Sequence, residues 1–494
     1  MEAVDLALFE WSRARIHPDE IDRYLDGGRD FIDDAAILTA LAGAQAPDDA
    51  RLGALLAKSM AVQDLSLAEA AELMAVTEPA QRQRMAEAAW AVKRRVYGAS
   101  VAAYAPLYLG NACVNSCTYC GFQARGADPA RRVLSEAEIQ SQVEVLVGQL
   151  GHRQLLAVVS EHPSTGAKYL RDSLAAVHSV QARRGDGYAQ AGCVGLHAPP
   201  MCIADLESLR DAGLGSYHVH QATYDRAAFQ ASHPSGPKSD YRWRLYAMHR
   251  AMDAGIGQVG LGVLTGLADW RFEGLALVAH AQALEGRFGA GPATVQLQRL
   301  GPDDPAADPA WAVDEDGFLR LLTVLRLALP YVGLIVASSE GHAVRSRALA
   351  LGVTLTDAAP AIGVGAYHEG GVIGALSCRQ FALGDPAPLQ DLVRELAVSG
   401  SLTSFHSPGL RRARPGGAPM ASLRDGAMAK ACRLNAVLSF KEWIEDFADL
   451  DVRALGERLL EKEAADLVRE FPDCRAWLAD QLGRVSRGER GLAF

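Results

Sequence analysis

Short apolar runs alternate with amphipathic segments of helical length through the middle of the chain. Strands are predicted over residues 105–109, 154–160, 188–196, 215–220, 258–264, 294–298 and 332–337. Helices are predicted over 169–182, 204–212, 241–254, 272–287, 315–329 and 342–351. Strands that alternate with helices form a parallel sheet, and about eight such units predict a closed TIM-type (β/α)8 barrel of the α/β class. The working face of that fold lies at the carboxyl ends of the strands.

Residues 16–99 follow a helical pattern without strands between the helices. Helix starts are indicated at Pro18, Ser66 and Glu78, because Pro suits a first turn and acidic residues suit the positive end of a helix. We therefore expect a helical N-terminal extension over 1–99, the barrel over 100–400 and a helical C-terminal region over 401–494.

Composition narrows the class of protein. The 494 residues are too many for one ordinary core and suit a large barrel with additions. With 49% hydrophobic and 22% charged residues, the chain is expected to be globular and soluble. A net charge of −10 argues against a general nucleic-acid binder. We expect a cytoplasmic protein without membrane contact, because neither a signal peptide nor a run of 18 apolar residues is found.

Three of the eight cysteines fall in one short stretch directly after the first predicted strand, Cys113-Val-Asn-Ser-Cys117-Thr-Tyr-Cys120. Without a secretory signal, reduced thiols or a metal site are expected rather than disulfides. Three thiolates can hold three irons of a four-iron cluster and leave the fourth open to a small molecule. Zinc usually takes four Cys or His ligands in paired clusters, and no second CxxC is found. Three unrelated buried thiols are the other alternative.

Other polar and small residues follow the predicted strands at the same expected face. Glu161 ends the second strand, His218, His220 and Gln221 cluster at the fourth, and the glycines of 260–266 follow the fifth. Glycine there would let a nucleoside approach the backbone. Each feature also has an ordinary interpretation, as a capping carboxylate, a satisfied core histidine or a turn.

The CxxxCxxC spacing, with Tyr119 before the third cysteine, resembles the signature of the radical S-adenosylmethionine (SAM) superfamily. Residues 15–450 resemble its FeFe-hydrogenase maturase and thiamine-pathway 2-iminoacetate synthase group, the tyrosine lyases. The matching stretches are 105–122, 221–256 with the unusual run HPSGPKSDY, 259–267 and 435–448. This resemblance implies a radical SAM barrel that includes a biotin/thiamine synthesis-associated region over about 265–395.

In that superfamily a reduced four-iron four-sulfur (4Fe-4S) cluster splits SAM into methionine and a 5′-deoxyadenosyl radical. The group cleaves tyrosine between Cα and Cβ to p-cresol and dehydroglycine, and its hydrogenase branch makes carbon monoxide and cyanide at a second, C-terminal cluster. The resemblance implies one 4Fe-4S cluster and SAM as cofactors, and a flavodoxin- or ferredoxin-type electron donor as partner. It implies Cys113, Cys117 and Cys120 as iron ligands, Glu161 at the SAM amino group, Arg244 at its carboxylate, Tyr119, Gly260, Gly262 and Gly266 at its adenosine, and Gln221, Tyr224 and Arg299 at the substrate.

The C-terminal cluster motif departs from the family pattern. Its phrase SFCTACYR reads Ser404-Phe-His406-Ser-Pro-Gly409-Leu-Arg here, and the third ligand position, 22 residues further on, is Cys432. One thiolate and one imidazole cannot replace three thiolates. His406 is expected to be an ordinary polar residue, and we predict neither a second cluster nor carbon monoxide and cyanide synthesis.

The substrate side departs as well. The family phrase QETY reads Gln-Ala-Thr-Tyr over 221–224 and loses a carboxylate, and the phrases matching 298–302, 338–340 and 359–367 each lose an arginine. Because Arg suits a carboxylate gripped by two hydrogen bonds, these losses predict lyase-type carbon–carbon cleavage of a small, amino-acid-like substrate other than tyrosine. A true tyrosine lyase, a decayed or apo regulatory paralogue, and a non-catalytic metallocluster maturation scaffold are the alternatives.

Overall fold

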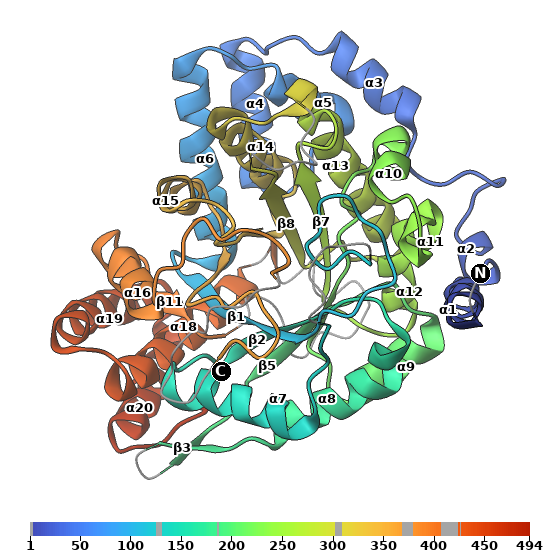
Figure 1. Cartoon of the computed structure of the whole chain (residues 1–494). Helices are drawn as coiled ribbons and strands as arrows, with labels where there is room; N and C mark the ends of the chain where they lie inside the picture. The colour runs from blue at the N-terminus through green and yellow to red at the C-terminus, as the bar shows by residue number, and fades with distance from the viewer. Residues whose placement is uncertain are drawn as a thin grey trace.

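The computed structural model describes residues 3–124, 131–184, 187–301, 309–367, 379–406, 423–424 and 426–494. At its centre, parallel strands close into a barrel (Figure 1), which confirms the predicted fold. The order around the barrel is β1 (Val101–Gly110), β2 (Gln154–Val159), β5 (Cys193–His197), β6 (Ser216–His218), β7 (Val259–Thr265), β8 (Thr294–Arg299), β9 (Gly333–Val336) and β10 (Leu355–Asp357). Closure comes from β10, which pairs in parallel with β1 and sets Tyr104 opposite Asp357.

The strands are buried on both faces, as parallel strands under a layer of helices must be. Every residue of β1 and of β7 is buried, so these strands read as continuous apolar runs. The covering helices are α7 (Glu136–Val143), α8 (Ala167–Ser179), α9 (Ile203–Asp211), α10 (Arg226–Ser232), α11 (Tyr241–Leu245), α12 (Ala247–Asp253), α13 (Trp270–Phe288), α14 (Glu315–Ala328) and α15 (His342–Ala350). A π-helical turn over Glu144–Gln149 continues α7, and short 3-10 turns lie at Pro163–Thr165, Pro237–Ser239 and Pro309–Trp311.

Two predicted elements differ from the structure, and one barrel strand was not predicted. The strand predicted over 188–196 is two elements, because β4 (Gly187–Ala189) pairs antiparallel with β3 (Ala182–Arg184) before β5 begins. The helix predicted over 241–254 is interrupted at Tyr246, between α11 and α12. The barrel strand β10 was not predicted, since three residues are too few to show a period.

The N-terminal region is helical, as predicted. Its helices are α1 (Ala3–Ala14), α2 (Asp19–Asp22), α3 (Asp34–Gly43), α4 (Asp49–Met60), α5 (Leu67–Met74) and α6 (Pro79–Tyr97). Ser66 caps α5 and forms a capping box with Glu69, and Glu78 precedes Pro79 at the first position of α6. Figure 1 shows α4, α5 and α6 beside α13 and α14, whereas α1 and α2 lie near α11 and α12. The backbone N–H of Leu65 donates to Ala328 O at 3.0 Å.

The C-terminal region is helical too and lies at the starts of the strands. It comprises α16 (Leu389–Val398), β11 (Thr403–Ser404), α18 (Ala427–Asp446), α19 (Leu450–Glu470), a 3-10 turn at Pro472–Cys474 and α20 (Arg475–Ser486). β11 pairs in parallel with the first residues of β1, and Glu442 of α18 forms an ion pair with Arg153, just before β2. In the described part of the chain, no helix combines the length and apolar character that a membrane span requires.

Candidate active site

The three cysteines lie on the loop that follows β1, at the carboxyl end of the barrel. One side of this loop is held by the end of β2. The backbone N–H of Val114 donates to Glu161 O at 2.9 Å, and the Ser160 hydroxyl donates to Ala112 O at 2.5 Å. The loop therefore has a defined path before any ligand binds.

The other side of the loop is held by a turn over residues 233–238, which follows α10. The Ser116 backbone N–H donates to Ser235 O at 3.2 Å, and the Lys238 N–H donates to the Asn115 side chain at 2.9 Å. At Gly236 the φ angle is +92°, and a Cβ there would lie 2.3 Å from Asn115 Oδ1. In the sequence, this HPSGPK run served only as a mark of resemblance to the family. Its Ser-Gly-Pro order is the signal for a fixed turn.

The thiols share a buried setting with hydrogen-bond donors aimed at sulfur. Phe122 N–H lies 3.4 Å from Cys120 Sγ, and Asn115 Nδ2 lies 3.7 Å from Cys113 Sγ. Burial, followed by the charge of Cys117, raises the pKa of Cys120 to about 12, and a coordinated metal lowers the pKa of a thiol. Lys238 is buried close enough to all three thiols to interact with their charge.

These residues suit a cluster better than a single ion. Across the described ranges, no three His, Cys, Asp or Glu side chains converge on one metal ion, and this holds for the three cysteines as well. Soft sulfur donors, N–H groups aimed at sulfur and a buried cation nearby together fit a 4Fe-4S cluster.

Buried charges of both signs surround the loop. Glu161 accepts a hydrogen bond from Asn115 Nδ2 on one oxygen at 2.7 Å, while its other oxygen is buried without a partner. Lys238 Nζ donates to the Tyr119 hydroxyl at 2.7 Å, and Arg244 Nε donates to His220 O at 2.5 Å. An ammonium could pair with Glu161, and a carboxylate with Lys238 or Arg244.

A cavity of about 110 Å³ lies inside the barrel, next to the cysteine loop. Its wall nearest the loop includes Tyr119, Lys238 and Arg244. The strands and their ends contribute most of its remaining polar and aromatic wall, and a segment before α16 adds two residues: Tyr104, Tyr108, His197, His220, Gln296, Gln298 and Asp357 from the strands, and Gln380 and Phe381 from the segment. A substrate in this cavity would lie between the cysteine loop and the strands.

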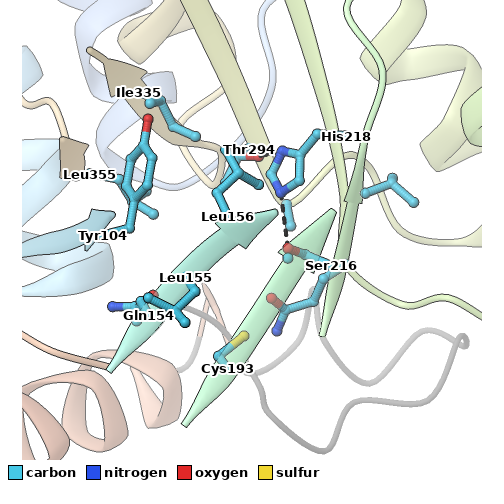
Figure 2. Close-up of a pocket in the computed structure, with 14 residues that line it drawn as sticks. Tyr104, Gln154, Leu155, Leu156, Cys193, Ser216, His218, Thr294, Ile335 and Leu355 are labelled. Atoms are coloured by element: carbon cyan, nitrogen blue, oxygen red, sulfur yellow. Dashed lines mark hydrogen bonds between the residues drawn. The ribbon is translucent and has the colours of Figure 1, made fainter. Parts of the chain in front are cut away.

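A second, smaller cavity of about 50 Å³ lies at the starts of the strands. Figure 2 shows His218 in this cavity, hydrogen-bonded to Ser216 at 2.9 Å, with Tyr104 and Leu156 across from it. Tyr104 lines both cavities. His218 and His220, predicted to cluster at the fourth strand, therefore belong to different levels of the barrel interior.

Gly260 and Gly262 of β7 leave space for the rings of His218 and His220. A Cβ at Gly260 would lie 2.1 Å from His218 Nδ1, and one at Gly262 would lie 2.5 Å from His220 Cδ2. The imidazole rings occupy the space where side chains at Gly260 and Gly262 would lie, and the contact of these glycines with adenosine stays a prediction. Gly266 has a φ angle of +106°, so its own backbone conformation accounts for glycine there.

The predicted substrate contacts are separated. Gln221 is buried with both amide atoms unpaired. Tyr224 points to the helical layer, where its hydroxyl bonds His280 of α13 at 2.8 Å. Arg299 pairs with Glu340 at 2.8 Å, and strand alternation gives the cavity Gln296 and Gln298 instead. Neither Tyr224 nor Arg299 lines the cavity.

The residues of the altered C-terminal motif lie elsewhere. His406 is buried just after β11, at the start of β1, whereas the cysteine loop follows the end of β1. Cys432 is half-buried on α18, and position 409 lies outside the described residues. The two parts of the chain thus occupy opposite ends of the barrel.

Known proteins resemble the chain in sequence over this region. A family model described as the radical SAM superfamily matches residues 107–278. The 2-iminoacetate synthase of Escherichia coli (strain K12) is 30% identical over 303 residues, which cover 60% of this chain and 77% of that protein. The 2-iminoacetate synthase of Salmonella typhimurium matches to the same extent.

Solved structures resemble it over nearly its full length. A crystal structure of HydG, a maturase of the [FeFe]-hydrogenase, is 30% identical with a TM-score of 0.86, covering 94% of this chain and 100% of that one. HydG from Carboxydothermus hydrogenoformans is 28% identical with a TM-score of 0.69, covering 88% and 93%. Methylornithine synthase, at 17% identity and a TM-score of 0.54, shares the fold.

Proposed function

Since this chain belongs to the radical SAM superfamily, we propose that Cys113, Cys117 and Cys120 hold its 4Fe-4S cluster and that the adjoining barrel cavity receives the substrate. Enzymes of the superfamily use such a cluster together with SAM. The observation that supports this assignment is the cysteine loop itself. It is fixed by β2 and by the 233–238 turn next to the cavity of about 110 Å³.

The buried charges beside the loop would orient SAM. The unpaired oxygen of Glu161 would accept a hydrogen bond from the SAM ammonium group. The buried Arg244 and the half-buried Lys238 would face its carboxylate, and this attraction is strengthened because water screens it less than at the surface. When bound and reduced, the cluster would supply the electron that cleaves SAM to methionine and a hydrogen-abstracting 5′-deoxyadenosyl radical. A flavodoxin- or ferredoxin-type donor would deliver that electron.

The reaction we propose is lyase-type carbon–carbon cleavage of a small, amino-acid-like substrate other than tyrosine. Gln296 and Gln298 give the cavity neutral hydrogen-bonding groups, and Arg299 is neutralised by Glu340. On the β8 side of the cavity, no arginine within the described residues is therefore available to bind an amino-acid carboxylate. Burial of the cavity would keep water from a radical intermediate.

We also propose that the protein has one cluster and makes neither carbon monoxide nor cyanide. Of the three ligand positions in the family's C-terminal motif, only Cys432 carries a cysteine. The alternative is a true tyrosine lyase, which the 30% identity to 2-iminoacetate synthases favours.

An anaerobic assay with SAM, dithionite and tyrosine separates these functions. We expect 5′-deoxyadenosine to form slowly without p-cresol. Release of p-cresol in amounts matching deoxyadenosine would assign the protein to the tyrosine lyases. Cluster binding without any deoxyadenosine would instead favour a maturation scaffold.

A further inference from the structure

Asp357, the last residue of β10, places a buried carboxylate in the wall of the larger cavity. Its side chain is 4% exposed. One oxygen accepts from the Ser338 backbone N–H at 2.6 Å, and the other accepts from the Ser338 hydroxyl at 2.7 Å. Both donors are neutral, so these hydrogen bonds orient the carboxylate without cancelling its charge.

The nearby arginines are already paired with other carboxylates. Arg345 forms an ion pair with Asp385 at 2.6 Å and donates to the backbone oxygen of Asp357 at 3.3 Å. Burial raises the pKa of Asp357, whereas the Ser338 hydrogen bonds and the charge of Arg345 oppose that rise and favour the carboxylate. Arg299 pairs with Glu340. Within the described residues, the Asp357 carboxylate therefore has no ion-pair partner of its own.

The other polar groups on this side of the cavity do not supply a positive charge. Burial, followed by the charge of His218, lowers the pKa of His197 to about 3, and burial holds the pKa of His220 well below its usual value. Both imidazoles are therefore neutral at pH 7. Lys238 and Arg244 belong to the wall beside the cysteine loop, where they donate to Tyr119 and to His220 O.

Aromatic rings complete the surroundings of this carboxylate. Tyr104 is the direct neighbour of Asp357 across the β1–β10 pair, and Tyr108 lies four residues further along the same face of β1. Both tyrosines line the cavity. A carboxylate beside aromatic faces attracts a cation, whereas a second carboxylate buried there would meet a like charge.

We propose that the substrate enters this cavity as a protonated amine held by Asp357 beside Tyr104 and Tyr108, and that it carries no carboxylate at that end. This inference rests on the proposed function and narrows its amino-acid-like substrate to an amine. Asp357 gives this end of the cavity a negative charge, whereas an amino-acid carboxylate requires a positive one.

Matched ligands test this on the wild-type holoenzyme. The measurement is equilibrium dialysis under anaerobic conditions with SAM present and reductant omitted, so that no turnover occurs. The probes are three sets, each an amine with its amino acid and its acid: tyramine, tyrosine and 3-(4-hydroxyphenyl)propionate; tryptamine, tryptophan and indole-3-propionate; butylamine, norvaline and pentanoate. In at least one set the amine should bind ten times more tightly than the amino acid, and the acid should not bind. Binding of no amine, or tighter binding of the amino acid in every set, would overturn the proposal.

A charge-removing variant adds a second test. Asp357→Asn keeps the shape of the side chain and an oxygen that can accept from Ser338, but it removes the negative charge. The affinity for the preferred amine should therefore fall at least tenfold, while SAM affinity stays within twofold. Glu273→Gln is the matched control, because Glu273 is a buried carboxyl outside the cavity, bonded to the Tyr224 backbone N–H at 2.8 Å. It should bind the amine as the wild type does. Unchanged amine affinity in Asp357→Asn would contradict the role of Asp357. The wild-type ranking decides the proposal if that variant does not fold.

The same preparation distinguishes this inference from the proposed function. Deoxyadenosine formed with SAM and dithionite, without any preference for amines, would overturn the inference alone. A clear preference for amines in a protein that forms no deoxyadenosine would overturn the proposed catalysis and leave the binding site standing.

Discussion

Glu161 and Lys238 bring opposite charges to the cysteine loop from its two sides. Burial raises the pKa of Glu161 and lowers that of Lys238, while hydrogen bonding from Asn115 and the charges of Arg244 and Lys238 oppose the shift at Glu161. Two buried charges that meet a common loop are costly unless a ligand pairs with them. A zwitterionic cofactor would supply both partners, an ammonium for Glu161 and a carboxylate for Lys238.

Loss of one thiol should remove the cluster. Cys117→Ala leaves two thiolates for the irons, so we expect iron content after anaerobic reconstitution to fall at least fivefold, together with the brown absorbance. Cys432→Ala is the matched control and should keep wild-type iron, because we assign no cluster to α18. Equal iron loss in both variants would contradict the assignment.

Sequence reasoning identified the residues of the cysteine loop but not the direction of every side chain. Cys113, Cys117 and Cys120 could be found because their spacing alone brings three thiols together. The position of Asp357 in the cavity wall could not be predicted, since its three-residue strand shows no periodicity. Tyr224 and Arg299 were expected at the substrate. Alternation along β8 directs Arg299 to Glu340, whereas Tyr224 lies beyond the end of β6 and bonds His280 of α13, so a period could not predict its direction.

At the scale of elements, the 233–238 turn supports the cysteine loop from outside the barrel. Gly236→Ala would force a left-handed residue and push a methyl group against Asn115, whose Oδ1 lies 2.3 Å from the Cβ position. With φ of +92° and ψ of 174°, this residue has a conformation almost restricted to glycine, and the conformational cost alone is about 1–3 kcal/mol. We expect the variant to retain less than half of the wild-type iron after gel filtration.

Gly400→Ala provides the comparison for this effect. Its φ angle is +80°, but a Cβ there has no neighbour within 4 Å, so it carries the strain without the contact. We expect a slightly lower melting temperature and full iron content. Iron loss of the same size in Gly400→Ala would show that general destabilisation, not the contact with Asn115, explains the result.

Glu273 links α13 to the segment after β6, and its protonation should make stability depend on pH. It accepts from the Tyr224 N–H at 2.8 Å, and burial raises its pKa to about 7. A raised pKa in the folded state gives stability that is complete below the unfolded value of 4.5 and is lost as pH rises through about 7. Between pH 5 and 8 this group should cost the wild type about 3 kcal/mol.

Glu273→Gln removes that titration and isolates the effect. The variant should be more stable than the wild type at pH 8 and lose this advantage at pH 5, as measured by urea unfolding at both values. A stability difference that is the same at pH 5 and pH 8 would show that Glu273 does not titrate in this range.

Long periodic elements were predicted well, and short ones were not. Apolar runs such as those of β7 and α14 locate strands and helices because their burial covers several periods. The antiparallel pair β3–β4 and the break between α11 and α12 depend on tertiary packing. The pattern of hydrophobic and polar residues along the chain could not reveal either feature.

At the scale of the whole molecule, the cysteine loop and the C-terminal helices lie at opposite ends of the barrel. The cysteine loop follows the end of β1, and the C-terminal helices pack around the start of β1 and β2. We expect about four irons per chain after anaerobic reconstitution, which is one cluster. About eight irons per chain would mean that the C-terminal region also binds a cluster despite its altered motif.

The central claim is that the loop of Cys113, Cys117 and Cys120 makes this protein a radical SAM enzyme. Its most direct test is the yield of 5′-deoxyadenosine from SAM and dithionite under anaerobic conditions, with wild type and Cys117→Ala side by side. We predict several equivalents of deoxyadenosine per chain from the wild type over hours and none above background from the variant. Absence of product from a wild type with a full cluster, or equal product from both proteins, would contradict the claim.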